Sequence, residues 1–187
     1  MTKTKTKASS ARSPQKVPKK AARKAAKKPG GPARLAPRPA AASRVEMTEI
    51  VFPTDANPLG NVMGGRIMHW VDICAAVAAG RHARTPVVTA SVDKIDFHNP
   101  VPVGGVVVLR AAVNFTGRTS MEIGVKVWQE DRTTGRRNHV VSAYLTFVSL
   151  DPVTRKPAQI PPVLPKTSEE KRRFGDGKRR NHDHHCK

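Results

Sequence analysis

A run of thirteen residues from Ile67 to Ala79 is apolar on almost every side, and its one acidic residue is Asp72. A helix that is apolar all round is normally buried, so this run predicts a helix at the centre of the fold. A buried carboxylate is costly unless it is paired, hydrogen-bonded or protonated. Asp72 is therefore either a structural residue with a neighbouring hydroxyl or amide as its partner, or a catalytic one. The glycine turn at Gly64 and Gly65, just before the helix, favours the catalytic interpretation.

Segments that alternate apolar and polar residues lie on both sides of this helix in the sequence. Alternation with a period of two is typical of strands with one buried face. The helix is expected at about 64–82, one strand precedes it, and four strands follow it: 45–52, then 87–98, 106–115, 121–127 and 139–150. A single antiparallel sheet wrapped around one central helix would bury such a helix best, which predicts an α+β fold.

The formal net charge of +20 is concentrated at the two ends of the chain. Residues 1–44 hold 14 Lys or Arg and no acid, whereas residues 45–165 hold 12 basic and 10 acidic residues. We therefore expect a folded domain at 44–151 between two disordered basic tails. Residues 1–43 have too few large apolar residues to offset their ordering entropy, and residues 152–187 turn to Pro, Lys and Arg. The N-terminal tail suits weak binding to polyanions through phosphate neutralisation, and a solvated extension without a partner is an equal alternative.

Cysteine usage and hydropathy exclude several other classes of protein. Cys74 and Cys186 are the only cysteines, and their positions imply no disulfide framework. No apolar run is long enough to span a bilayer, and the basic N-terminus has no apolar segment typical of a secretory signal. A cytoplasmic location is the default expectation.

Several short motifs stand in register with a known family. The chain resembles the hotdog-fold acyl-CoA thioesterases, in the acyl-CoA hydrolase branch that includes brain-type acyl-CoA hydrolase and its bacterial relatives. The resemblance covers roughly residues 44–151 and rests on Asp55-Ala56-Asn57, Gly60-Asn61-Val62, Gly64-Gly65, Ile67-Met68, Asp72, Phe97, Pro100, Val103-Gly104 and Gly117-Arg118-Thr119-Ser120-Met121. It implies a hotdog fold, hydrolysis of acyl-CoA thioesters in fatty acid metabolism, no cofactor, no metal, and a homo-oligomer that is a dimer or a trimer of dimers.

A thioester hydrolase needs donors for the developing oxyanion and a carboxylate that activates water or attacks carbon. The backbone N–H groups of Gly64 and Gly65, at the positive end of the helix dipole, suit the first task. A steric need for glycine at this turn is the alternative interpretation. Asp72 suits the second task, but it lies about 10 Å along the helix axis from Gly65, which is too far for one chain to complete the site. The resemblance implies that Asn61 of one subunit and Asp72 of its partner, as general base or nucleophile, share a site.

Three further assignments depend on the resemblance. Asn57 competes with Asn61 for the active-site role, and Asn61 is favoured because it aligns beside the glycine pair. Met63 stands where many relatives carry His or Phe, so it is assigned to the wall of the acyl channel. Gly117, Arg118, Thr119 and Ser120 are assigned to CoA binding, with a solvated hairpin turn as an equal alternative.

Two rival functions remain to be distinguished. A hydratase on the same fold would need an active-site histidine, and residues 57–65 contain none. A hotdog binding module tethered to polyanions by its tail, with little or no catalysis, is the alternative from a different class.

Overall fold

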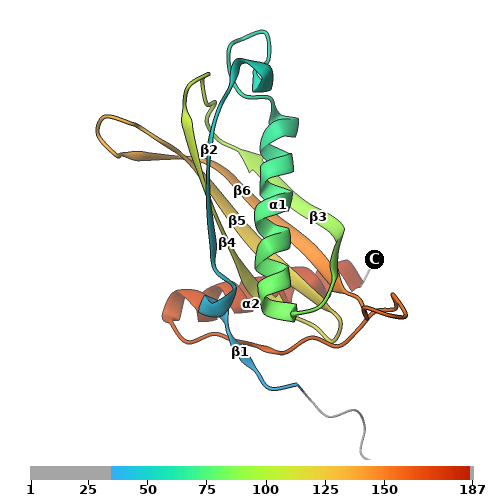
Figure 1. The fold of residues 1–187 in the computed structure, drawn as a ribbon. Helices are drawn as coiled ribbons and strands as arrows, with labels where there is room; N and C mark the ends of the chain where they lie inside the picture. The colour runs from blue at the N-terminus through green and yellow to red at the C-terminus, as the bar shows by residue number, and fades with distance from the viewer. Residues whose placement is uncertain (1–34, 186–187) are drawn as a thin grey trace, which may run out of the picture. The chain divides into compact units, whose positions relative to one another are not determined.

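The computed structural model describes residues 35–185, and within them an antiparallel sheet curves around one long helix (Figure 1). In chain order the elements are β1 (Arg38–Pro39), η1 (Ala40–Ser43), β2 (Val45–Ile50), η2 (Pro53–Asp55), α1 (Gly64–Ala83), β3 (Val87–Phe97), β4 (Val106–Thr116), β5 (Ser120–Glu130), β6 (Arg137–Ser149), β7 (Val163–Leu164) and α2 (Ser168–His185). The predicted order of strand, helix and four strands is confirmed.

The main sheet has the strand order β2-β4-β5-β6-β3, with every neighbouring pair antiparallel. Strands β4, β5 and β6 form a meander, and β3 returns to the far edge beside β6. The side chains that face α1 follow the predicted alternation; on β5, for example, Ile123, Val125 and Val127 are all fully buried. The period-two pattern therefore placed the core face of β5 correctly, whereas on β4 a register shift after Val113 turns Phe115 toward α2.

Helix α1 is buried on one side and exposed on the other. Its buried residues recur every three to four positions: Ile67, Trp70, Val71, Cys74, Ala75, Ala78, Ala79, His82 and Ala83. Met68, Ile73 and Val77 are 46%, 40% and 43% exposed, so the prediction of burial on every side is wrong for a single chain. The physical reason is that one curved sheet covers only one side of a helix.

The exposed side of α1 lies next to the edge strand β3. Val88 and Val92 on β3 are 44% and 51% exposed, and Thr89 contacts α1 through Asp72. We name Met68, Ile73, Val77, Val88 and Val92 the α1–β3 stripe. It is an apolar surface beside an unpaired sheet edge.

The segment after Asp151 contradicts the prediction of a disordered C-terminal tail at 152–187. It contains β7 and the helix α2, which lies on the face of the sheet opposite α1 (Figure 1). Phe174 of α2 packs on Phe115 with ring centroids 5.4 Å apart, and Arg180 pairs with the buried Glu122. A few specific anchors order this helix although its overall composition is polar.

The prediction of a disordered N-terminal tail at 1–43 is also wrong for residues 38–43, which form β1 and η1. Strand β1 pairs in parallel with β7, and η1 buries Ala40 and Ser43. The Ser43 hydroxyl accepts a hydrogen bond from the backbone N–H of Val113 at 3.0 Å. The remainder of that predicted tail, 1–34, lies outside the described residues.

Candidate active site

The loop between β2 and α1 is fixed at its base by Asp55, which is 2% exposed. One carboxylate oxygen of Asp55 accepts a hydrogen bond from Arg66 Nε at 2.6 Å, and the other accepts the Phe52 N–H at 3.1 Å. The bond from Arg66 lowers the pKa of Asp55 below its usual value. The Met63 N–H donates to the Asp55 carbonyl at 2.8 Å, so the start of α1 is tied to the start of the loop.

The two candidate asparagines lie within the same closed turn. The Asn57 N–H donates to the Asn61 carbonyl at 2.8 Å, and the Asn57 side-chain oxygen accepts the backbone N–H groups of Leu59 and Asn61. Gly60 has a φ of +74°, which a glycine adopts without strain. Both asparagines are half-buried, and within the described residues the Asn57 side-chain amide nitrogen donates to no group. The turn therefore presents one amide as an available donor.

The first turn of α1 offers further donors. The backbone N–H groups of Gly64 and Gly65 have no hydrogen-bond partner in the described part of the chain, as is normal for the first N–H groups of a helix. Both glycines are exposed. A cavity of about 230 Å³ lies beside Gly64, and its walls include Phe97, whose ring would be 3.5 Å from a Cβ at Gly64. Met63 is 42% exposed but does not line this cavity.

Asp72 lies about two turns further along α1, on the margin of the α1–β3 stripe. It is half-buried, and its carboxylate accepts a hydrogen bond from the Thr89 hydroxyl at 2.7 Å. A hydroxyl partner for Asp72 was one of the two expectations from the sequence, but Thr89 was not identified as that partner. There was little sign of this contact in the sequence, because a threonine in a strand is common. Thr89 also lies next to a register shift of β3, between Thr89 and Ser91.

The structure of one chain does not bring these groups together. Asp72 is eight residues from Gly64, about 12 Å along the axis, and no contact joins Asp72 to residues 57–65 within the described residues. The Gly117–Ser120 turn lies at the opposite end of β4 from the β2–α1 loop, and a strand of this length spans about 35 Å. Arg118 is exposed there, while its carbonyl accepts the Ile160 N–H at 3.1 Å.

Neither a metal site nor a membrane span is found within residues 35–185. No group of three or more His, Cys, Asp or Glu side chains in this range is arranged to hold a metal ion. Neither helix of the range is both long and apolar enough to cross a bilayer.

Known proteins resemble this chain in sequence. The family model of the thioesterase superfamily matches residues 59–136. YkhA of Bacillus subtilis, an uncharacterized acyl-CoA thioester hydrolase, is 41% identical over 128 residues, which is 68% of this chain and 74% of YkhA. The cytosolic acyl coenzyme A thioester hydrolase of Rattus norvegicus is 37% identical over 146 residues, which is 77% of this chain but 38% of the rat protein.

Solved structures agree with the sequence relatives. An apo-hexameric acyl-CoA thioesterase superposes with a TM-score of 0.76 at 38% identity, covering 80% of this chain and 95% of the other. The acyl-CoA hydrolase of Staphylococcus aureus, solved with butyryl coenzyme A, coenzyme A and coenzyme A disulfide, gives a TM-score of 0.76 at 32% identity, covering 80% and 90%. The resemblance and the hotdog fold expected from the sequence are confirmed, and the chain belongs to the acyl-CoA thioester hydrolases of the thioesterase superfamily.

Proposed function

We propose that this protein hydrolyses acyl-CoA thioesters to a carboxylic acid and free CoA. The names of its relatives and the CoA-bound structures of the Staphylococcus aureus hydrolase support this activity. The observation that carries the proposal is Asp72, a carboxylate that a threonine hydroxyl orients on the exposed side of α1. The N-terminus of the same helix offers two available backbone donors.

A pattern of spacing supports Asp72 and Thr89 and revises the choice of asparagine. The Staphylococcus aureus hydrolase has been solved with alanine in place of one aspartate, one asparagine and one threonine. There the aspartate follows the asparagine by 15 residues and the threonine follows the aspartate by 17. Asn57, Asp72 and Thr89 have the same spacing here, since 72 − 57 = 15 and 89 − 72 = 17. We therefore favour Asn57, whose amide nitrogen is available, over Asn61 as the active-site asparagine.

The complete site requires more than one chain. Strand β3 is a sheet edge that is largely exposed, and exposed apolar edges are normally covered by another segment or chain. Two solved relatives are hexameric. A two-fold pairing of β3 with the β3 of a second chain would bury the α1–β3 stripe and bring Asp72 toward the partner's 57–65 loop. We propose a homo-oligomer, a dimer or a trimer of dimers, in which the Gly117–Ser120 turn reaches the substrate from a neighbouring chain.

Each group then has a defined task in the reaction. The N–H groups of Gly64 and Gly65 donate to the thioester oxygen as it becomes an oxyanion. In one route Asp72 takes a proton from the water that attacks the carbonyl carbon, the carbon–sulfur bond breaks, and that proton passes to the leaving thiolate of CoA. In the other route Asp72 attacks the carbon itself and the thiolate leaves, and water then hydrolyses the resulting anhydride, which releases the carboxylic acid and restores Asp72. Arg118, with the hydroxyls of Thr119 and Ser120, contacts a phosphate or a pantetheine amide of CoA.

Free-thiol release from a panel of acyl-CoA esters of increasing chain length tests the activity. Asp72→Asn should lower kcat by about a hundredfold or more, the usual range for a general base. Glu49→Gln, a change at a half-buried carboxylate on β2, is the matched control and should leave kcat unchanged. Full activity in Asp72→Asn would exclude Asp72 from the mechanism, and wild-type protein that releases no thiol would favour the binding-module alternative.

Two finer assignments are tested with the same panel. Asn57→Ala should lower kcat far more than Asn61→Ala, and the reverse order would restore Asn61 to the site. Met63→Ala should change which chain length is hydrolysed fastest if Met63 lines the acyl channel. An unchanged chain-length profile would remove Met63 from the channel.

The cellular location and the role of the N-terminal tail follow as secondary proposals. We propose a cytoplasmic location, which the name of the cytosolic rat relative supports and which cell fractionation tests. Weak polyanion binding by the basic residues 1–43 is tested by a salt-dependent shift assay on the full chain and on a chain that begins at Arg44.

A further inference from the structure

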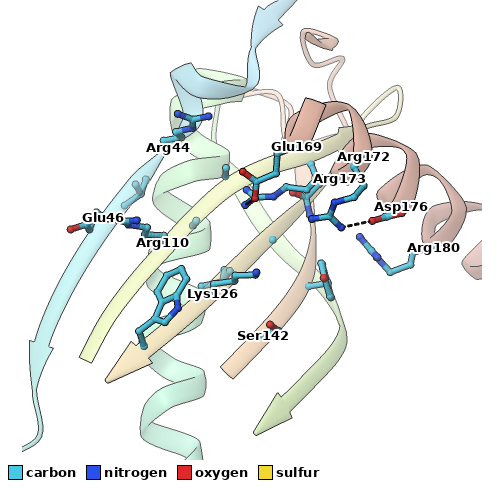
Figure 2. A pocket seen from close by; sticks show the side chains of 18 residues that line it. Arg44, Glu46, Arg110, Lys126, Ser142, Glu169, Arg172, Arg173, Asp176 and Arg180 are labelled. Atoms are coloured by element: carbon cyan, nitrogen blue, oxygen red, sulfur yellow. Dashed lines mark hydrogen bonds and ion pairs between the residues drawn. The ribbon is translucent and has the colours of Figure 1, made fainter. Parts of the chain in front are cut away.

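A second cavity, of about 830 Å³, lies on the face of the sheet opposite α1, under helix α2 (Figure 2). Its floor consists of outward-facing side chains of β4, β5 and β6, and its roof is the side of α2 that carries Arg172, Arg173 and Asp176. The whole sheet separates it from the loop 57–65 and from Asp72. This cavity has no part in the proposed hydrolysis.

The floor is hollow because the residues at its centre are small. Ala112 faces Gly124 across the β4–β5 ladder, and Ser142 faces Lys126 across the β5–β6 ladder. Gly124 has no room for a side chain, because a Cβ there would lie 2.5 Å from the Asn114 amide nitrogen. The amide of Asn114 is in turn bound to the buried Glu122. The cavity is therefore a fixed feature of the outer face of the sheet.

Positive charge predominates around the cavity. The charged residues that line it are six cations, Arg44, Arg110, Lys126, Arg172, Arg173 and Arg180, and three anions, Glu46, Glu169 and Asp176. Each of the five arginines has a carboxylate partner. Lys126 differs, since no carboxylate lies within 4.0 Å of its amine in the described part of the chain. Among the charged side chains that line this cavity, the Lys126 amine is therefore the cation that an anionic ligand would neutralise.

Arg110, although paired with Glu46, is a second cation beside Lys126. It lies directly opposite Lys126 in the β4–β5 register, where two side chains of like charge destabilise a sheet. Figure 2 shows Lys126 on the floor between Arg110 and Ser142, below the arginines of α2. Arg110 donates its Nε to Glu46, which leaves the terminal nitrogens of a five-donor guanidinium for another acceptor. An anion between Lys126 and Arg110 would relieve the repulsion and accept hydrogen bonds from both.

We propose that this cavity binds a small phosphate-bearing anion, with Lys126 and Arg110 as its principal contacts. Phosphate oxygens suit an ammonium and a guanidinium group together. Trp128 lines the cavity beside Arg110, whose guanidinium lies 5.8 Å from the indole centroid, and offers an apolar wall to an organic group attached to the phosphate. Because α2 closes one side of the cavity, a compact anion fits it better than an extended nucleic acid.

Isothermal titration of the full chain in about 150 mM salt tests the proposal, with pyrophosphate, ATP and adenosine as separate ligands. Pyrophosphate and ATP should bind saturably, and adenosine should bind far more weakly than either. Equal affinity for pyrophosphate and ATP would show that the cavity recognises the phosphate alone. Tighter binding of ATP would show that the cavity also contacts the organic group attached to the phosphate. Equal affinity for adenosine and ATP would overturn the proposal.

Matched variants locate the binding. Lys126→Met should weaken pyrophosphate binding by about tenfold, as expected for a lost charged hydrogen bond, whereas Lys156→Met, at an exposed lysine outside the cavity, should leave it unchanged. Without ligand, Lys126→Met should melt at or above the wild-type temperature because the cross-strand repulsion is gone. Its KM for an acyl-CoA should stay at the wild-type value. Unchanged pyrophosphate binding in Lys126→Met would place the binding elsewhere, such as the basic N-terminal segment, and would refute the assignment.

Discussion

Replacement of Glu122 by Gln is expected to release α2 from the sheet and to leave the rest of the fold in place. Glu122 is 3% exposed and accepts two hydrogen bonds from Arg180, at 2.7 and 2.9 Å, and one from Asn114 at 2.9 Å. The hydrogen bonds that Arg180 donates to Glu122 raise the pKa of Arg180. A neutral glutamine keeps the shape but loses the charge, and its amide nitrogen would face a guanidinium that only donates. A charged hydrogen bond contributes about 1.5–3 kcal/mol, and the side chains around the variant residue relax to recover part of the loss. The free energy that holds α2 on the sheet should therefore fall by about 2–3 kcal/mol.

That loss corresponds to an increase of about 30- to 150-fold in the equilibrium constant for opening of α2. The remaining anchors of the helix include Phe174 on Phe115 and Arg44 bound to Glu170. Hydrogen exchange followed by mass spectrometry should therefore show faster exchange in peptides of α2 while peptides of α1 stay protected.

Arg173→Gln is the matched control on the same helix, because its pair with Glu169 is an exposed i,i+4 contact. It should change the exchange of α2 by no more than about twofold. Unchanged exchange of α2 in the Glu122→Gln variant would show that the buried pair does not hold the helix. Equal acceleration in α1 and α2 would show that α2 is not a separate unfolding unit.

Three further predictions concern stability. Gly124→Ala should destabilise the protein by about 1–3 kcal/mol in urea unfolding, because its Cβ would meet the Asn114 amide. Gly80→Ala is the control, because a Cβ there meets no atom within 4 Å and the residue is helical, so this change should not destabilise the protein. Burial lowers the pKa of His82 below its usual 6.5, so the unfolded chain takes up a proton more readily than the folded protein and stability should fall as the pH drops from about 7.5 to about 5.5. In urea unfolding midpoints measured against pH, His82→Gln should flatten this slope. An equal slope in the variant would show that His82 is not the cause. The pKa of Asp55 is lowered, so the ionised carboxylate stabilises the fold at pH values above the usual pKa of 3.8, and this stabilisation is lost as the pH falls below 3.8. Asp55→Asn should therefore reduce the loss of stability between about pH 5 and pH 3, measured by circular dichroism.

Elements in which apolar residues recur at a regular spacing were predictable from the sequence, and the structure shows why. Strand β5 alternates so regularly that its inner face, Ile123 to Val127, could be read directly. The helix α1 followed from its glycine start and its apolar run. Both signals are local, since they depend on residues within one element.

Features that depend on contacts between distant segments were not predictable. The polar α2 is ordered by Arg180 reaching Glu122, 58 residues away, and the sequence around either residue gives no sign of that pair. The Thr89 hydroxyl meets Asp72 only because the chain reverses after α1. Burial of α1 on every side was inferred from the helix alone, whereas the sheet of one chain covers only one of its sides.

The short parallel pairing of β1 with β7 has a consequence for anyone who wishes to shorten this protein. Arg38 pairs with Val163 in that ladder and also donates a hydrogen bond to the His82 carbonyl at 2.5 Å, so it joins three distant parts of the chain. Trimming to residues 44–151, the limits that composition suggests, would remove both strands and α2, and would expose the end of α1 and the outer face of the sheet to water. A minimal version should instead begin no later than residue 35 and retain the whole of α2.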